Sequence, residues 1–155
     1  MIIRKIKILL LIFIIFFSLS TESKGIDENC VHESSIFRCV QYIANYDGDT
    51  IMVNIPDVHP LLGKRIKIRI YGINAPEIKT TDRCEKVKAY QARDIVRNIL
   101  QNAQTINLEN VQRDKYFRIL AVVVADGKSV GLILLQKGLA YEYFGATKRN
   151  IDWCR

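Results

Sequence analysis

The chain has 155 residues, of which 49% are hydrophobic and 25% are charged, and its 23 Lys and Arg residues outnumber its 16 Asp and Glu residues to give a formal net charge of +7. It contains no internal repeats or low-complexity tracts, which excludes a repeat array and predicts one domain with its own hydrophobic core. A positive balance suits a polyanionic partner such as nucleic acid, but the same balance also simply keeps a domain soluble.

Residues 1–20 have the pattern of a secretory signal peptide. Three basic residues precede an almost unbroken apolar run from Ile8 to Phe17, and small residues follow at Ser18 and Ser20. The run is shorter than the about 20 apolar residues that span a bilayer. We therefore favour cleavage and a secreted, periplasmic or cell-envelope protein, with contact to a membrane only if the segment stays uncleaved as an anchor. Without residues 1–20, 20 basic and 16 acidic residues give a net charge of +4.

All four cysteines follow this segment, at Cys30, Cys39, Cys84 and Cys154. An even number in an exported chain predicts two disulfides, for which three pairings are possible, and their spacing is not of the zinc-binding type. We favour Cys30 with Cys39, which would staple a loose extension at 21–36 to the domain at 37–155. Cys84 with Cys154 would then tie the chain end to the main helix, and closing this long loop contributes on the order of 4 kcal/mol in chain-entropy terms.

Strands are expected near residues 37–46, 50–56 and 64–73, where apolar and β-branched residues alternate with turn signals. The stretch 65–70 alternates strictly between basic residues and isoleucines. This alternation places Ile66, Ile68 and Ile70 on the core face of the strand. Arg69 is therefore predicted to face away from the core.

A helix is expected to begin after Asp82, a suitable N-cap with Glu85 three residues later. Its apolar stripe should cover one side of the sheet and consists of Ala89, Ala92, Val96, Ile99 and Leu100.

Two further strands are expected near 104–111 and 117–125, followed by a turn at Asp126-Gly127. Ser129 can cap a short helix that Gly138 ends, and a last strand is expected at 140–143, with Trp153 and its neighbouring cysteine fixing the chain end. About five short strands with an inserted helix fit an α+β fold of the OB type, a small closed five-stranded Greek-key barrel, whose surface commonly binds oligonucleotides.

Four short pieces of the chain supply groups suited to cleaving a phosphodiester: Asp47-Gly48-Asp49-Thr50, Arg69, Asn74-Ala75-Pro76-Glu77 and Tyr116-Phe117-Arg118. Phosphoryl transfer places negative charge on the phosphate oxygens, and the planar forks of Arg69 and Arg118 can each bind two of them. Asp49 offers oxygen ligands to Ca²⁺ or Mg²⁺, and Glu77 could accept a proton from an attacking water.

The order and spacing of these pieces resemble the staphylococcal nuclease (thermonuclease) family over about residues 39–143. The resemblance implies the same OB fold and a nuclease that hydrolyses DNA and RNA with little sequence preference. It also implies residue roles: calcium held by Asp49, Asn74 and the carbonyl of Ala75, catalysis by Arg69, Glu77 and Arg118, and nucleotide contacts from Lys115 and Tyr116.

Three positions depart from the family pattern. Asn74 stands where the family usually has a second aspartate, so the site loses one negative charge and should bind calcium more weakly. Ala75 replaces a threonine, which matters less if only its carbonyl is a ligand. Phe117 replaces the glycine beside the catalytic arginine and could restrict the backbone there, because only glycine visits positive φ freely.

Other interpretations of the same residues stay open. Asp47 and Asp49 taken alone would be turn formers, and Tyr116 is as well explained as a half-buried strand aromatic as a base-stacking platform. The aromatic residues at 141, 143 and 144 favour packing over nucleotide contact, and neither histidine is assigned a role. The alternative function is a noncatalytic OB-fold module that binds nucleic acid or a protein at the cell envelope, and in either case we expect a monomer without an obligate protein partner.

Overall fold

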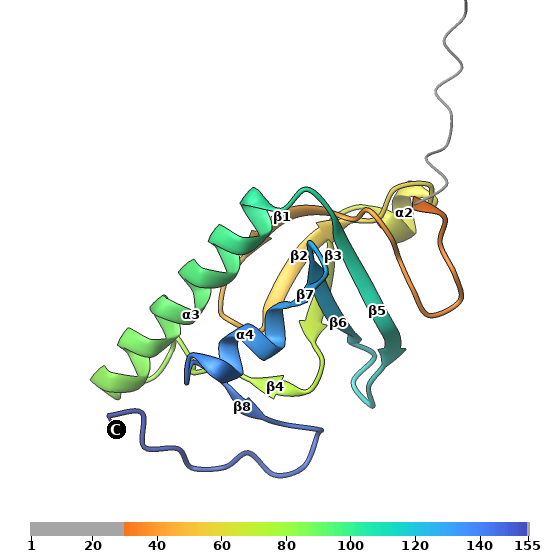
Figure 1. Ribbon diagram of the computed structural model, residues 1–155. Coiled ribbons are helices and arrows are strands. Elements are labelled where there is room, and N and C mark those ends of the chain that lie inside the picture. The colour runs from red at the N-terminus through yellow and green to blue at the C-terminus, as the bar shows by residue number, and fades with distance from the viewer. Residues whose placement is uncertain (1–29, 155) are drawn as a thin grey trace, which may run out of the picture.

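The computed structural model describes residues 30–154 of the chain (Figure 1). The predicted signal peptide and the first part of the predicted extension lie outside these residues. Between residues 30 and 154, no helix has both the length and the apolar character that a membrane span requires. The elements are, in chain order, β1 (Gln41–Asn45), β2 (Thr50–Asn54), α2 (Pro60–Gly63), β3 (Ile66–Ile70), β4 (Ile73–Asn74), α3 (Arg83–Asn102), β5 (Ile106–Arg113), β6 (Ile119–Ala125), β7 (Lys128–Ser129), α4 (Val130–Gln136) and β8 (Tyr141–Glu142).

The main sheet has the strand order β1-β2-β3-β6-β5, with β7 paired to β6. Its neighbouring strands are antiparallel except β3 and β6, which run parallel with α3 in the crossover between them. Figure 1 shows α3 running along one side of this sheet and α4 lying near its lower end. The OB-type α+β fold is confirmed, but the ladder of strands does not close into the predicted barrel.

The two edges of the ladder are joined by the chain that precedes β1. Phe37 exchanges backbone hydrogen bonds of 2.9 and 2.8 Å with Leu108 in β5, and the Val40 N–H donates to the Ile106 carbonyl at 2.8 Å. Between these two contacts Cys39 has φ +54, and its N–H donates to the Asn107 side chain instead of a strand partner. The predicted strand at 37–46 therefore begins only at Gln41, because the backbone leaves the extended conformation at the disulfide-bonded cysteine.

The predicted strand at 64–73 is also broken, and the break shapes the site. β3 ends at Ile70, the chain turns at Gly72 with φ +83, and β4 then pairs with β8 in a separate two-stranded sheet. Glycine adopts this positive φ without the steric cost that a Cβ would impose. The turn folds Asn74 back toward Arg69, only five residues earlier in the chain, so that the two side chains meet.

α3 begins where the sequence predicts, because the Asp82 side chain accepts hydrogen bonds from the N–H groups of Cys84 (2.7 Å) and Glu85 (3.0 Å). Its predicted apolar stripe faces the sheet, with four residues buried and Ile99 partly buried. The largest fully buried side chains opposite and around it are Ile51, Val53, Ile68, Ile70, Leu108, Val123 and Leu134. Burying this surface is the main stabilising contribution to the domain.

The two short helices are capped by side chains. Ser129 begins α4 by accepting from the Leu132 N–H at 3.3 Å, as predicted, and Gly138 follows the helix with φ +63. α2 is not among the predicted elements, although Pro60 at its first position and the His59 cap, which accepts from the Leu61 N–H at 3.2 Å, are its local signals.

Both favoured disulfides are present, Cys30–Cys39 and Cys84–Cys154. After β8 the chain returns to the beginning of α3, where Cys154 bonds to Cys84 (Figure 1). Trp153 is only half-buried and lies against Tyr141, with 6.3 Å between ring centroids. The disulfide and this aromatic contact together hold the chain end, in place of a fully buried indole.

Candidate active site

The acidic turn Asp47–Thr50 joins β1 to β2 and is closed by its own side chains. Asp47 Oδ1 accepts hydrogen bonds from the N–H groups of Asp49 (3.2 Å) and Thr50 (2.8 Å). Burial raises the pKa of the Asp47 carboxyl, against the Thr50 hydrogen bond and the charge of Arg69, which lower it, while the charge of Glu77 raises it further. The turn therefore carries a carboxylate in an environment that Arg69 and Glu77 both influence.

Two further residues hold this turn against α3. The Asn45 side-chain amide donates to the carbonyls of Asp47 (2.8 Å) and Arg93 (2.9 Å), which bridges the turn to the helix. A Cβ at Gly48 would lie 2.6 Å from the Ala92 Cβ and 3.0 Å from the Ala75 Cβ. Glycine is thus required at position 48 by the close approach of the helix and of the chain after β4.

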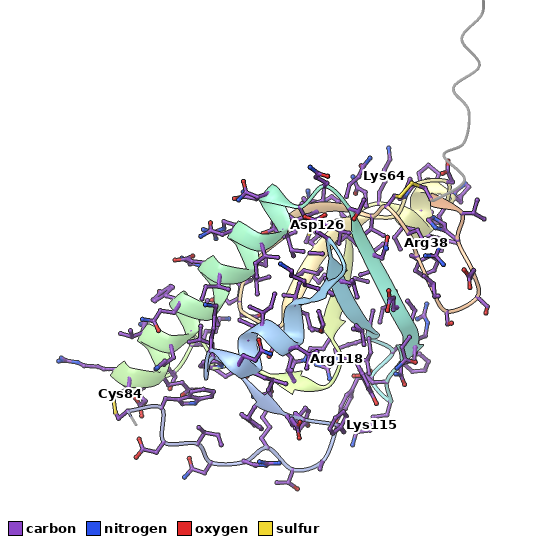
Figure 2. The ribbon with its side chains drawn as sticks, viewed as in Figure 1. Arg38, Lys64, Cys84, Lys115, Arg118 and Asp126 are labelled. Atoms are coloured by element: carbon purple, nitrogen blue, oxygen red, sulfur yellow. A yellow bond between two sulfur atoms is a disulfide. The ribbon has the colours of Figure 1, made fainter. Side chains whose placement is uncertain are left out.

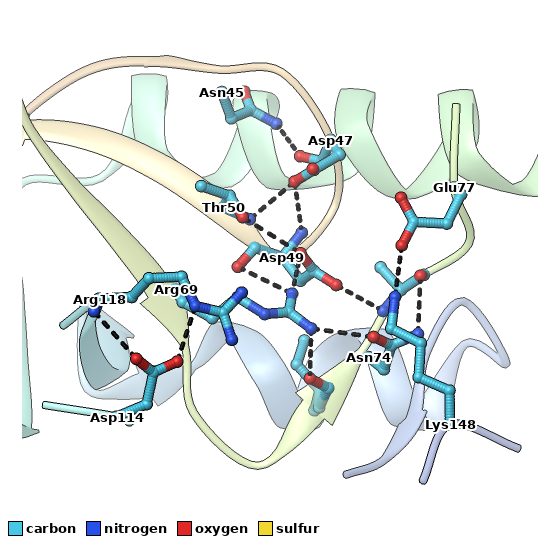
Figure 3. Close-up of polar contacts among 12 residues, drawn as sticks. Asn45, Asp47, Asp49, Thr50, Arg69, Asn74, Glu77, Asp114, Arg118 and Lys148 are labelled. Carbon is cyan, nitrogen blue, oxygen red and sulfur yellow. Dashed lines mark hydrogen bonds and ion pairs between the residues drawn. The ribbon is translucent and has the colours of Figure 1, made fainter. Parts of the chain in front are cut away.

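Asp49 and Arg69 form a nearly buried ion pair at the centre of the site (Figure 3). Asp49 also accepts from the Ala75 N–H at 2.8 Å and from the Thr50 hydroxyl at 3.3 Å. The Arg69 side chain is only 11% exposed, although its neighbours in the strand alternate as predicted. Arg69 points away from the core as expected, but Asp49 and the chain after β3 cover it.

Arg69 also binds the chain that follows the Gly72 turn. Its Nη2 donates to Asn74 Oδ1 at 3.0 Å and to the Ile73 carbonyl at 3.3 Å (Figure 3). Burial lowers the pKa of Arg69, the charge of Asp47 opposes this shift, and the charge of Arg118 adds to it. An arginine stays charged despite such a shift, so a fixed cation lies among the predicted metal ligands and the predicted catalytic groups.

The three predicted metal ligands are neighbours. The Ala75 N–H binds Asp49, and the Asn74 side-chain amide donates to the Ala75 carbonyl at 3.2 Å. A carboxylate, an amide oxygen and a main-chain carbonyl are the hard oxygen donors that Ca²⁺ and Mg²⁺ take. The Asn74 and Ala75 oxygens each accept one protein hydrogen bond and keep a second lone pair. The donor set therefore fits such an ion, with a single formal negative charge among its three members.

Glu77 stands apart from this buried group. Its backbone N–H donates to Glu85 Oε1 at 3.0 Å, which fixes the loop to the first turn of α3. Its side chain is 55% exposed, and its carboxylate accepts a hydrogen bond of 2.6 Å from Lys148 Nζ. The carboxylate of Glu77 is thus accessible to solvent, while the backbone of the residue is fixed to α3.

Arg118 lies on the loop between β5 and β6, and Asp114 organises that loop. Asp114 accepts from the N–H groups of Tyr116 (2.8 Å) and Arg118 (2.9 Å) and from Arg118 Nε (2.7 Å). Desolvation opposes the shift, but these hydrogen bonds and the charge of Arg118 lower the pKa of Asp114 below its ordinary value. The side chain of Arg118 is 53% exposed, so its guanidinium is oriented by Asp114 without being enclosed.

Aromatic residues stand beside this arginine. Tyr116 is 66% exposed on the loop and lies 5.6 Å from the Arg118 guanidinium and 5.2 Å from Lys115 Nζ, measured to its ring centroid. It is therefore not a half-buried strand residue. Phe117 has φ +61, the left-handed conformation that its usual glycine counterpart would adopt freely, and its ring is 79% exposed.

A cleft of about 420 Å³ separates the sheet from this loop and brings Arg69 and Arg118 to one space. Figure 2 shows Lys115 and Arg118 close together, far from Lys64 at the α2 end. Basic and aromatic side chains dominate the lining, which includes Arg69, Tyr71, Arg113, Lys115, Tyr116, Arg118, Tyr143 and Phe144. A second cleft of similar volume, between β1 and the end of α3, has no charged side chain among its lining residues, all of which the structure describes.

The structure thus brings the predicted residues into one region: Asp49, Asn74 and Ala75 around Arg69, with Arg118, Lys115 and Tyr116 across the cleft. Sequence reasoning missed the residues that position them. Asn45 and Asp114 had local signals, each being a side chain that commonly binds nearby backbone N–H or carbonyl groups in turns. Lys148 had no signal, because it reaches Glu77 across 71 positions of sequence.

Together, the OB-type sheet and a site of two arginines beside hard oxygen donors define a small domain suited to binding phosphate groups. The chain belongs to the family described as staphylococcal nuclease homologue, which it matches over residues 67–152. Nucleases of this family generally depend on a metal ion.

Two curated relatives come from Bacillus subtilis (strain 168). The chain is 39% identical over 109 residues to endonuclease YncB, an alignment that covers 66% of this chain and 48% of the relative. It is also 39% identical over 109 residues to the SPbeta prophage-derived endonuclease YokF, covering 66% of this chain and 34% of the relative. The chain therefore spans about half or less of the length of these relatives.

Proposed function

We propose that this protein is an exported, calcium-dependent nuclease that hydrolyses phosphodiester bonds of DNA, RNA or both with little sequence preference. The observation that carries the proposal is the cleft that Arg69 and Arg118 share, although 49 positions separate them in the sequence. Both relatives named above are endonucleases by name, which supports the same activity here. We further propose that the protein acts as a monomer outside the cell or at the cell envelope.

The arginines would divide the work of binding phosphate. Arg69 is held in place by Asp49 and Asn74, so it offers a fixed positive charge at the floor of the cleft. Arg118 is oriented by Asp114 and keeps free donors facing solvent, so it can close on the phosphate oxygens as their negative charge grows. Lys115 and Tyr116 would hold the adjoining phosphate and base, since stacking on an exposed aromatic ring is worth about 1 to 3 kcal/mol per base.

Glu77 would act on the attacking water, either as a general base or by orienting it. Its carboxylate is half exposed and its backbone is fixed by Glu85, which suits a group that must meet solvent at a defined place. Asp49, Asn74 and the Ala75 carbonyl would hold a calcium ion, which supplies positive charge to the phosphate and lowers the pKa of a bound water.

The first test is hydrolysis of single-stranded and duplex DNA, and of RNA, by the oxidised protein lacking residues 1–20. Calcium is titrated over a wide range, with chelator as the control. We expect cleavage only with calcium, and at least a hundredfold loss of rate in Glu77→Gln, with unchanged thermal unfolding. Lys64→Ala, at the opposite end of the domain, serves as a matched surface control and should keep its full rate. A normal rate in Glu77→Gln would contradict the assignment.

The metal assignment has its own test in Asn74→Asp. A second carboxylate keeps the acceptor for Arg69 and adds the missing charge, so half-maximal activity should require about tenfold less calcium. Calcium titrations of both proteins, followed by activity and by isothermal calorimetry, check this. An unchanged calcium requirement would place the ion elsewhere.

The alternative is a noncatalytic module that binds nucleic acid or a protein partner, and the reduced charge at Asn74 favours it. Such a module would bind an oligonucleotide equally well in chelator and in calcium and would cleave nothing at any calcium concentration. The proposed location is tested by comparing the mass of the exported protein with that of the full translation, because an uncleaved anchor would keep residues 1–20.

A further inference from the structure

A cation from the end of the chain lies at the proposed base. Lys148 Nζ donates to Glu77 Oε1 at 2.6 Å (Figure 3). Lys148 belongs to residues 144–154, the C-terminal strap, which runs from β8 back to α3. None of the family motifs in the sequence includes this lysine, and it is not among the residues that line the cleft between Arg69 and Arg118.

The strap has anchors at both ends. All of its residues are described, and they form no helix or strand that could hold it by backbone hydrogen bonds. Phe144 packs on Tyr71, with 5.7 Å between ring centroids, at one end. Cys154 is bonded to Cys84 at the other end, and Trp153 and Arg149 lie near the Tyr141 ring. The position of Lys148 therefore depends on these anchors, of which only the disulfide is covalent.

The ion pair itself cannot be what holds the strap. The side chains of Lys148 and Glu77 are 54% and 55% exposed, and solvent-exposed pairs contribute only about 0 to 1 kcal/mol. Lys148 has three N–H donors, of which Glu77 uses one, so the ammonium group can bind a second acceptor. Removing it should consequently leave stability nearly unchanged while removing a positive charge from the site.

The charge is placed where a polynucleotide needs it. A carboxylate such as Glu77 repels the phosphates of an approaching strand, and an ammonium beside it offsets that repulsion. The strap begins at the cleft, because residues 144–146 line it together with Arg69 and Arg118. Lys148 follows two residues later and lies at Glu77 (Figure 3). A strand that fills the cleft and extends toward Glu77 would bring a phosphate to Lys148.

We propose that Lys148 is a substrate-binding residue that contacts a phosphate of the polynucleotide and orients Glu77, and that the Cys84–Cys154 disulfide holds it there. This inference rests on the proposed nuclease function. It adds a fourth cation to Arg69, Arg118 and Lys115, and this cation comes from a segment that has no regular secondary structure. It also means that the site is complete only when Cys84 and Cys154 form their disulfide.

The test begins with Lys148→Ala in the oxidised protein. Affinity for a fluorescein-labelled single-stranded DNA 12-mer is measured in chelator by anisotropy, so that the readout does not depend on cleavage. We expect about tenfold weaker binding and a salt dependence smaller by roughly one phosphate contact, with unchanged thermal unfolding. Lys148→Arg should recover most of the affinity, and Lys137→Ala, which removes an exposed lysine at the C-terminal end of α4, should change nothing. Unaltered binding, or faster cleavage, in Lys148→Ala would overturn the inference.

The role of the disulfide is tested by a double-mutant cycle. In Cys84→Ser/Cys154→Ser the strap loses its covalent anchor, so adding Lys148→Ala should cost less than twofold further. In Cys30→Ser/Cys39→Ser, which removes the other disulfide, Lys148→Ala should keep its full effect. An equal effect of Lys148→Ala in both backgrounds would exclude the disulfide from the role. Thermal unfolding of Cys84→Ser/Cys154→Ser is measured first, and all binding assays of the cycle are run at a temperature at which this variant is folded.

The binding and cleavage experiments together distinguish a failure of this inference from a failure of the nuclease function on which it rests. If the wild type binds the 12-mer but cleaves nothing at any calcium concentration, the nuclease proposal fails, while the affinity of Lys148→Ala still decides whether this lysine binds phosphate. If the wild type cleaves and Lys148→Ala both binds and cleaves normally, the nuclease stands and the role of Lys148 fails.

Discussion

The cleft has two walls, which hold their arginines in opposite ways. The sheet wall carries Arg69 in β3, and the loop wall, residues 114–118, carries Arg118. On the sheet wall, Arg69 is nearly buried and bonded to Asp49 and Asn74, which are themselves buried. On the loop wall, Arg118 is half exposed and bonded to Asp114 at one edge of its guanidinium. The guanidinium group of Arg69 is thus part of the packed structure of the domain, whereas that of Arg118 is accessible to solvent.

This difference predicts that substitutions of the two arginines will affect stability and activity differently. A buried charge that loses its partner is costly because it has no water to replace the partner, whereas an exposed charge is rehydrated. Removing the arginine of the sheet wall should therefore damage the fold together with the activity, whereas removing the arginine of the loop wall should lower activity with little effect on stability. Four changes test this contrast, beginning with the one expected to have the largest effect.

Arg69→Met should lower the free energy of unfolding by about 3 kcal/mol, because it leaves the Asp49 carboxylate buried without its cation. Chemical denaturation measures this loss. Adding Asp49→Asn removes the stranded charge, so the double variant should regain part of the stability but none of the activity. A single variant as stable as the wild type would mean that the pair is already hydrated.

Arg118→Ala should reduce kcat by about 10² to 10³ while changing the free energy of unfolding by less than about 1 kcal/mol. The reason is that about half of the Arg118 side chain is already exposed to water and its partner Asp114 keeps two backbone donors. Steady-state hydrolysis and thermal unfolding of the same preparation give both values. A large loss of stability would show that the loop wall is as rigid as the sheet wall.

Phe117→Gly should stabilise the protein by about 1 kcal/mol, since the residue has φ +61 and its exposed ring leaves little packing to lose. Phe117→Ala is the matched control: it removes the ring, keeps the strained backbone, and should leave the midpoint of thermal unfolding almost unchanged. If the alanine and glycine variants behaved alike, the ring and not the backbone would determine stability here.

The smallest effect expected is a pH dependence of the loop wall. The pKa of Asp114 is lowered in the folded state, so its contribution to stability is present above the ordinary carboxyl pKa of 3.8 and is lost as the pH falls through the lower folded value. Asp114→Asn should therefore be less stable than the wild type at pH 7, and the difference should shrink below about pH 4. Urea denaturation at both pH values checks the sign, and a difference that grew in acid would reverse it.

The sequence predicted the parts of this molecule that local patterns encode. Asp82 and Glu85 predicted the start of α3, and the alternation at 65–70 predicted β3. The even number of cysteines after the predicted signal peptide predicted two disulfides. Family motifs supplied the site residues, and the structure gathers them in one region, although their chemical roles are proposals.

The remainder depended on contacts that no local pattern contains. The positive φ values at Cys39 and Gly72 cut two predicted strands short. The near burial of Arg69 results from its contacts with Asp49 and Asn74. The alternation along β3 predicts the face toward which a side chain points, but not how deeply that side chain is buried. Lys148 reached the site only through the path of the strap.

The close packing of Gly48 on Ala92 links the evolution of the site to that of the core. Ala92 lies on the buried face of α3 and would be classified as a packing residue in any mutational scan. A larger side chain there would push the acidic turn outward and carry Asp49 away from Arg69 and Ala75. A conservative substitution of Ala92 in the core would therefore act as a mutation of the candidate site. Residues 48 and 92 should consequently change only together in evolution.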